Sequence, residues 1–87
     1  MKIKEILDIP SIIILLYIHE KGEVRYGDLT KKIDSRGTLS KSIKDLMGEG
    51  LVDKKVVKGK PIKSFYTLTS KGKEIAKRMY DISKLYS

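Results

Sequence analysis

The chain has 87 residues, a net charge of +8 and no cysteine. This length suits one small domain over residues 1–87, and the missing cysteine excludes disulfides and thiolate metal sites. The single His19 does not build a zinc site alone, and the apolar run at residues 12–18 is far shorter than the roughly 20 residues of a membrane helix. We therefore expect a cytoplasmic protein with no metal, no other cofactor and no membrane contact.

The N-terminal part of the chain is predicted to be mainly helical. Residues 2–8, "KIKEILD", carry apolar side chains at helical spacing. Pro10 suits the first turn of a second helix, where its missing N–H costs nothing. This helix runs to about Glu20, ends at Gly22 and is apolar nearly all round, which is typical of a central buried helix. The following "EVRY" is either a strand fragment or a connection.

Two further helices follow, with a short turn between them. Residues 26–33 carry apolar side chains at positions i, i+3 and i+7, which indicates one face of a helix. "DSRG" breaks this pattern, and Ser35 is the expected N-cap of the next helix, because its hydroxyl accepts a free backbone N–H there. The apolar stripe of that helix is expected to contain Leu39, Ile43, Leu46 and Met47.

The sequence then changes to an extended pattern. Residues 51–57 and 64–69 are rich in Val, Phe, Tyr and Thr, and they flank the loop "KGKPIK" at residues 58–63. This arrangement predicts a β-hairpin. Its pairing is expected to bury Tyr66 and Leu68 on one face and to leave the lysines outward.

A final helix is predicted at residues 70–86, with Thr69 or Ser70 as its cap. Its apolar residues recur at spacings of four, three and four, as in the seam between two paired helices. Part of this stripe must pack on the domain itself, and we expect the rest to form a homodimer. The predicted dimer-interface residues are Ile75, Met79, Ile82 and Tyr86.

After the short segment at residues 2–8, the order of three helices, a hairpin and a last helix makes a winged helix-turn-helix, an α+β fold that is mainly α. The ordered motifs "GEGLV", "KGKP" and "YTLTSKG" resemble small winged-helix transcriptional regulators of the MarR- and ArsR-like superfamily, of the compact archaeal and bacterial type. The resemblance covers about residues 25–77. It implies double-stranded DNA as partner, with a recognition helix in the major groove and a wing on the backbone or minor groove. The sequence lacks the cysteine and histidine clusters of metal-sensing relatives and the extra helices of longer MarR-like sensors.

The side of residues 36–47 opposite the apolar stripe is expected to contact DNA. Arg36 is the expected base reader, because its planar guanidinium matches O6 and N7 of guanine, whereas lysines serve as point charges for phosphates. The resemblance implies a second contact through the lysine-rich wing at residues 58–63. The predicted DNA-binding residues are Arg36, Thr38, Ser40, Lys41, Lys44, Lys58, Lys60 and Lys63.

Positive charge is concentrated in residues 36–73, where ten basic residues against three acidic ones carry +7 of the net +8. Such a surface favours a polyanionic partner, although lysines also keep a small protein soluble. Three classes therefore stay open. A sequence-specific double-stranded DNA-binding transcriptional regulator is the leading hypothesis; the alternatives are a protein–protein interaction module on the same fold and a nonspecific chromatin- or RNA-binding protein. No nucleophile accompanied by a base and no Walker loop is present, so we do not expect an enzyme.

Overall fold

The structure, a computed structural model, describes residues 8–86. The predicted helix at residues 2–8 therefore lies outside the described residues except for Asp8. The elements in chain order are α2 (Ile9–Lys21), β1 (Glu23–Arg25), α3 (Tyr26–Thr30), α4 (Arg36–Gly48), β2 (Val52–Val57), β3 (Lys63–Leu68) and α5 (Ser70–Leu85). This order confirms the predicted winged helix-turn-helix fold.

Helix α2 forms the centre of the core. The Asp8 carboxylate accepts a hydrogen bond from the Ser11 N–H at 2.8 Å, which caps the first turn beside Pro10. The helix ends at Gly22, whose φ of 85° lies in the left-handed region that glycine tolerates. Helix α2 packs against α4, α5 and the sheet, while Ile12, Ile13, Leu16 and Tyr17 along its middle stay partly exposed. Its fully buried side chains are Ser11, Ile14, Leu15 and Ile18.

The sheet has three antiparallel strands in the order β1-β3-β2. "EVR" is thus a strand, which settles the open alternative for this segment. Directly opposed residues share a face, so Tyr66 lies on the same face as its partners Val24 on β1 and Lys54 on β2. Tyr66 and Leu68 are buried as predicted. Lys54 shares this face with Tyr66, yet it is exposed like the other lysines of the hairpin.

The helix-turn-helix consists of α3, a turn and α4. Helix α3 ends at Thr30 rather than at residue 33, because a turn takes over while Ile33 still packs into the core. Ser35 caps α4 as predicted, accepting the Thr38 N–H at 3.2 Å. Met47 is 38% exposed, contrary to prediction, and Ser42 is buried. The two residues lie on opposite edges of the Leu39–Ile43–Leu46 stripe, and only the Ser42 edge is covered.

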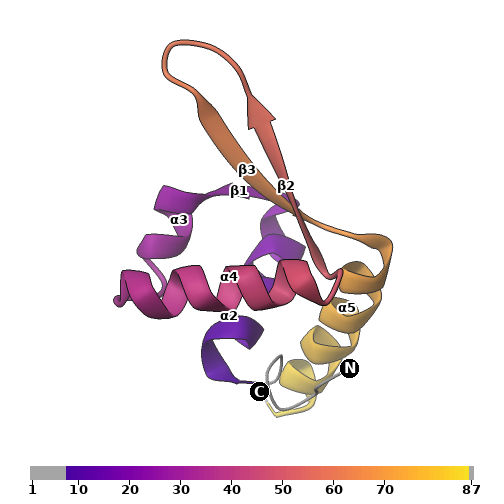
Figure 1. Cartoon of the computed structure of the whole chain (residues 1–87). Helices are drawn as coiled ribbons and strands as arrows, with labels where there is room; N and C mark the ends of the chain where they lie inside the picture. The colour runs from indigo at the N-terminus through magenta and orange to yellow at the C-terminus, as the bar shows by residue number, and fades with distance from the viewer. Residues whose placement is uncertain (1–7, 87) are drawn as a thin grey trace.

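The base of the β2–β3 hairpin is joined to the start of α5. Figure 1 shows the hairpin projecting away from the helices, above α4. At its base the Thr69 hydroxyl donates to the Gly50 carbonyl at 2.7 Å and accepts the Gly72 N–H at 3.0 Å. Gly72 is buried against the backbone of Leu51, where a Cβ atom would overlap the Leu51 carbonyl. The motif "LTSKG" therefore attaches the last helix to the base of the wing.

Candidate nucleic-acid interface

One side of α4 presents a row of polar and cationic side chains to solvent. Its predicted DNA-binding residues are all exposed, whereas Ser42, on the adjoining edge, is buried. The apolar stripe on the opposite side anchors the helix in the core, so the polar side faces outward along its length. In Figure 1 this helix crosses the molecule below the hairpin. The exposed predicted residues are Arg36, Thr38, Ser40, Lys41 and Lys44.

The wing tip carries cations together with apolar side chains. The predicted residues Lys58, Lys60 and Lys63 are exposed around the loop. Ile62 is also 67% exposed, and Val56 and Val57 at the strand ends are exposed too. Sequence reasoning missed this apolar character, since alternation along a strand indicates burial only where the strand lies over the body. Because the hairpin extends beyond the core, both of its faces meet solvent at the tip.

Two of the predicted contact residues on α4 already have partners within the protein. The Ser40 hydroxyl is hydrogen-bonded to the Tyr26 hydroxyl of α3 at 2.9 Å. The Lys41 ammonium lies 3.3 Å from the Asp45 carboxylate one turn later, with a Lys41 side chain that is 75% exposed. An exposed i,i+4 ion pair contributes only about 0.3–0.5 kcal/mol. Lys41 therefore stays available to a stronger anionic partner.

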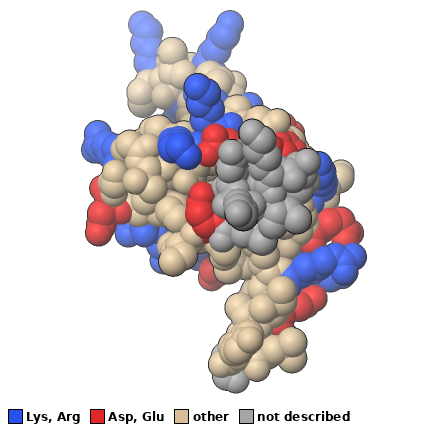
Figure 2. Space-filling model, turned by 60° about the horizontal axis from the view of Figure 1, so that its bottom comes forward, with Lys and Arg blue, Asp and Glu red and all other residues tan. Residues whose placement is uncertain are grey.

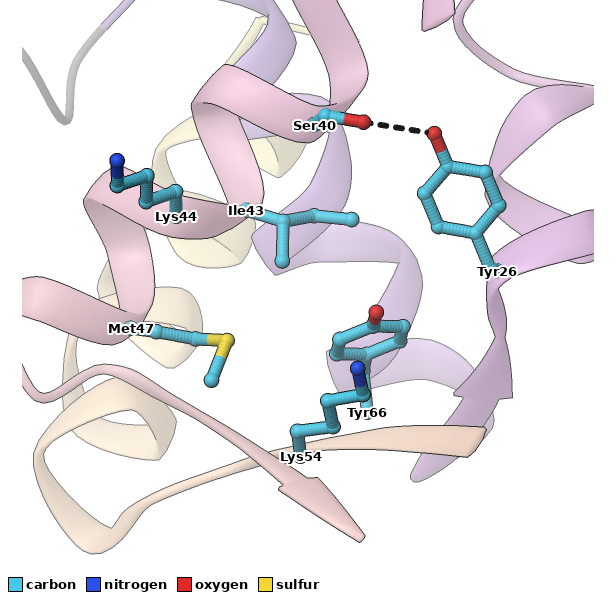
Figure 3. A pocket seen from close by; sticks show the side chains of 7 residues that line it. All are labelled: Tyr26, Ser40, Ile43, Lys44, Met47, Lys54 and Tyr66. Atoms are coloured by element: carbon cyan, nitrogen blue, oxygen red, sulfur yellow. Dashed lines mark hydrogen bonds between the residues drawn. The ribbon is translucent and has the colours of Figure 1, made fainter. Parts of the chain in front are cut away.

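A cavity of about 280 Å³ lies between α4 and the hairpin. Figure 3 shows Lys54 rising from β2 toward the Tyr66 ring, and Lys44 at the rim with its ammonium group directed outward. Ile43 and Met47 form the apolar part of the wall. Sequence reasoning missed Tyr26, Lys54 and Tyr66 as members of a site; the strand register is the only signal that places Lys54 beside Tyr66. The lining residues are Tyr26, Ser40, Ile43, Lys44, Met47, Lys54 and Tyr66.

The Tyr66 phenol in the wall of this cavity has a raised pKa. Burial raises the pKa of Tyr66 above its usual value, and the nearby Tyr26 raises this pKa further. Both effects disfavour the phenolate. The Tyr66 hydroxyl therefore keeps its proton at neutral pH and is a hydrogen-bond donor.

The predicted stripe on α5 divides into two parts. Ile75 and Met79 are half-buried and pack against the core. Ile82 is 56% exposed and Tyr86 is 89% exposed. Figure 2 shows the end of α5 extending from the body as a mostly uncharged protrusion. Of the predicted dimer-interface residues, Ile82 and Tyr86 are thus the ones exposed to solvent.

Among residues 8–86, no group of three or more His, Cys, Asp or Glu side chains is placed to hold a metal ion. None of the helices in the same range is long and apolar enough to cross a membrane.

Comparison with known proteins places this geometry among helix-turn-helix regulators. Residues 10–87 match the HxlR-like helix-turn-helix family. YtfH from Salmonella typhimurium superposes with a TM-score of 0.83 at 21% identity, covering 95% of this chain and 75% of that one. The transcriptional regulator homologue from Pyrococcus horikoshii OT3 gives 0.77 at 24% identity, covering 99% and 87%. The transcriptional repressor BigR from Xylella fastidiosa gives 0.77 at 23% identity, covering 92% and 77%. At these identities the structures show the shared fold, and no curated protein sequence gives a significant match.

Proposed function

This chain belongs to the HxlR-like helix-turn-helix family, whose structural neighbours are transcriptional regulators, and from that premise we propose that it is a sequence-specific regulator of double-stranded DNA. The observation that carries the proposal is the exposed polar side of α4 beside a cationic hairpin. A recognition helix needs such a side to enter the major groove. The proposed recognition segment is residues 36–47.

Base readout is assigned to the start of α4. Arg36 stands in its first turn and is exposed, with no ion pair among the described residues. A guanidinium that grips guanine O6 and N7 discriminates against other bases by about 1–3 kcal/mol. Thr38 and Ser40 add hydroxyl groups on the two edges of this exposed side, where they serve either base edges or phosphates.

Phosphate contacts are assigned to the lysines. Lys41 and Lys44 lie near the middle of the recognition side of α4, and Lys58, Lys60 and Lys63 surround the wing tip. Neutralised phosphates release counterions, so binding is expected to weaken steeply with salt. The wing, at residues 58–63, then adds affinity without reading sequence directly.

The interface with a second copy of the chain is assigned to the end of α5. Helices at residues 70–86 that pair through Ile82 and Tyr86 cover apolar surface that one chain leaves exposed, and Leu85 beside them is exposed as well. A two-fold dimer of this kind presents two recognition helices about 34 Å apart, one turn of DNA. The single domain 1–87 then reads one half-site.

Selection of bound duplexes from a random pool at moderate salt tests the proposal. The expected result is an enriched sequence made of two inverted half-sites. Equal enrichment of unrelated duplexes, or a preference for structured RNA, would instead favour a nonspecific nucleic-acid-binding protein. Failure to bind any duplex at about 50 mM salt, where phosphate contacts are strong, would favour a protein–protein interaction module.

A further inference from the structure

The cavity between α4 and the hairpin lies where a DNA strand has to pass. A helix in the major groove and a wing at the neighbouring minor groove have one sugar–phosphate strand between them, because that strand separates the two grooves. The space between the two elements is the 280 Å³ cavity. Its occupant in a complex is therefore the backbone rather than a base edge.

The lining of this cavity matches a phosphodiester. Its polar atoms come from two lysines and three hydroxyl groups, and none of its lining residues is acidic. Lysine ammonium groups and hydroxyls are among the usual phosphate ligands of DNA-binding proteins. Lys54 lies beside the Tyr66 ring, and Lys44 stands at the rim (Figure 3).

Two of the three hydroxyl groups have a proton free to donate to a ligand. In the hydrogen bond between Tyr26 and Ser40, one hydroxyl donates and the other accepts. The accepting hydroxyl keeps its own proton, which is free for an oxygen atom of a ligand. The Tyr66 hydroxyl is neutral at pH 7, as an ordinary phenol is, and burial raises its pKa further. An anionic oxygen entering the cavity therefore meets two hydroxyl donors, Tyr66 of β3 and the accepting member of the Tyr26–Ser40 pair.

We propose that this cavity is a phosphate seat, formed by Tyr26, Ser40, Lys44, Lys54 and Tyr66, for the DNA strand between the two grooves. The inference rests on the proposed function and deepens it, since it names one backbone phosphate per half-site that is held between helix and wing. Lys54 is its principal charged ligand. The seat fixes how far the wing stands from the recognition helix along the DNA.

The next residue in β2 provides a matched control. Lys55 pairs with Phe65, whereas Lys54 pairs with Tyr66, so the two lysines lie on opposite faces of the sheet. Both are exposed, and both contribute the same charge at nearly the same place in the chain. A difference between Lys54→Gln and Lys55→Gln therefore reports the position of the ammonium group rather than net charge.

The test uses the full chain and its selected duplex, with phosphates replaced one at a time by uncharged methylphosphonate. With the wild type, neutralising one phosphate in each half-site at the seat should weaken binding. With Lys54→Gln that replacement should have no further effect, while with Lys55→Gln it should weaken binding as in the wild type. Lys54→Gln should also lower the slope of log affinity against log salt by about 1 for each occupied seat. Matching urea unfolding curves for the two variants would confirm that both are folded.

Failure of the seat and failure of the proposed function give different results. Specific binding by the wild type with the same methylphosphonate profile in Lys54→Gln as in Lys55→Gln would overturn the seat alone. If both variants lose affinity equally and neither shows a position-dependent methylphosphonate profile, the seat is also overturned, because such a loss reports only net charge. Absence of duplex binding by the wild type would overturn the proposed function, and the seat with it.

Discussion

The hydroxyl groups of Tyr26 and Ser40 lie 2.9 Å apart and form a hydrogen bond between α3 and α4 across the turn of the helix-turn-helix. Tyr26 is the first residue of α3, and Ser40 lies in the second turn of α4. The bond therefore ties the part of α4 assigned to base readout to the helix that precedes it. It also places both hydroxyls at the phosphate seat.

This bond predicts coupling between the two residues in DNA binding. Tyr26→Phe and Ser40→Ala each remove the bond, and each should weaken binding of the selected duplex by about 0.5–1.5 kcal/mol, the net value of one hydrogen bond. Because both variants remove the same bond, the double variant should lose less than the sum of the two losses. Fluorescence anisotropy with the selected duplex measures the three affinities. Fully additive losses would show that the two hydroxyls act independently.

Arg36 and Lys60 should affect DNA binding in different ways. Arg36→Ala removes the base reader, so it should narrow the gap in affinity between the selected duplex and random DNA by about 1–3 kcal/mol. Lys60→Ala, at the wing, should weaken both duplexes alike and lower the salt slope by about 1. Titrations of both DNAs at several salt concentrations distinguish the two effects. Equal losses for both variants on both DNAs would remove the assignment of specific readout to Arg36.

Gly72 should be intolerant of a side chain. A Cβ at this position would overlap the carbonyl of Leu51, which is backbone and does not move aside. Gly72→Ala should therefore lower the free energy of unfolding by about 1–3 kcal/mol, as overpacking does. Gly48→Ala is the control, since nothing lies within 4 Å of its added Cβ. The free energy of unfolding of this control should stay level or rise by less than about 1 kcal/mol. Similar urea midpoints for the two variants would contradict the close contact between Gly72 and the Leu51 backbone.

Local patterns predicted the elements better than they predicted the site. The cap at Ser35 and the buried Tyr66 follow from residue type and spacing. For the last helix the same signals left Thr69 and Ser70 as alternatives, and Thr69 is the cap. The face occupied by Lys54 depends on strand register, which a loop of uncertain length does not define in advance. The exposure of Met47 depends on whether a neighbouring element covers its edge of α4, and that is a property of tertiary packing.

Tyr66 should make stability depend on pH in the alkaline range. Burial raises its pKa in the folded protein above the unfolded value of about 10. Between these two values the unfolded chain loses the proton while the folded chain keeps it, so the free energy of unfolding falls as pH rises through this window. Tyr66→Phe should show a smaller fall than the wild type. Tyr86→Phe is the control because Tyr86 is 89% exposed. Urea unfolding of the three proteins is compared below and above a pH of about 10. An equal fall in the free energy of unfolding of all three would contradict the role of burial.

Ile82 tests whether the end of α5 is where two copies of the chain meet. It lies one turn beyond Met79, which packs against the core, and it is itself exposed. A charge at an apolar contact between subunits is costly to bury, so Ile82→Glu should shift the protein from dimer to monomer. Lys77→Glu places the same charge on an already exposed, charged position of the helix and should leave the mass unchanged. Light scattering over a concentration series measures the mass, and unfolding curves check that both variants fold. If the wild type is a monomer, or if wild type and Ile82→Glu have equal masses, the subunits meet elsewhere or not at all. If the monomeric variant still binds a single half-site, α4 and the wing read DNA without the second copy.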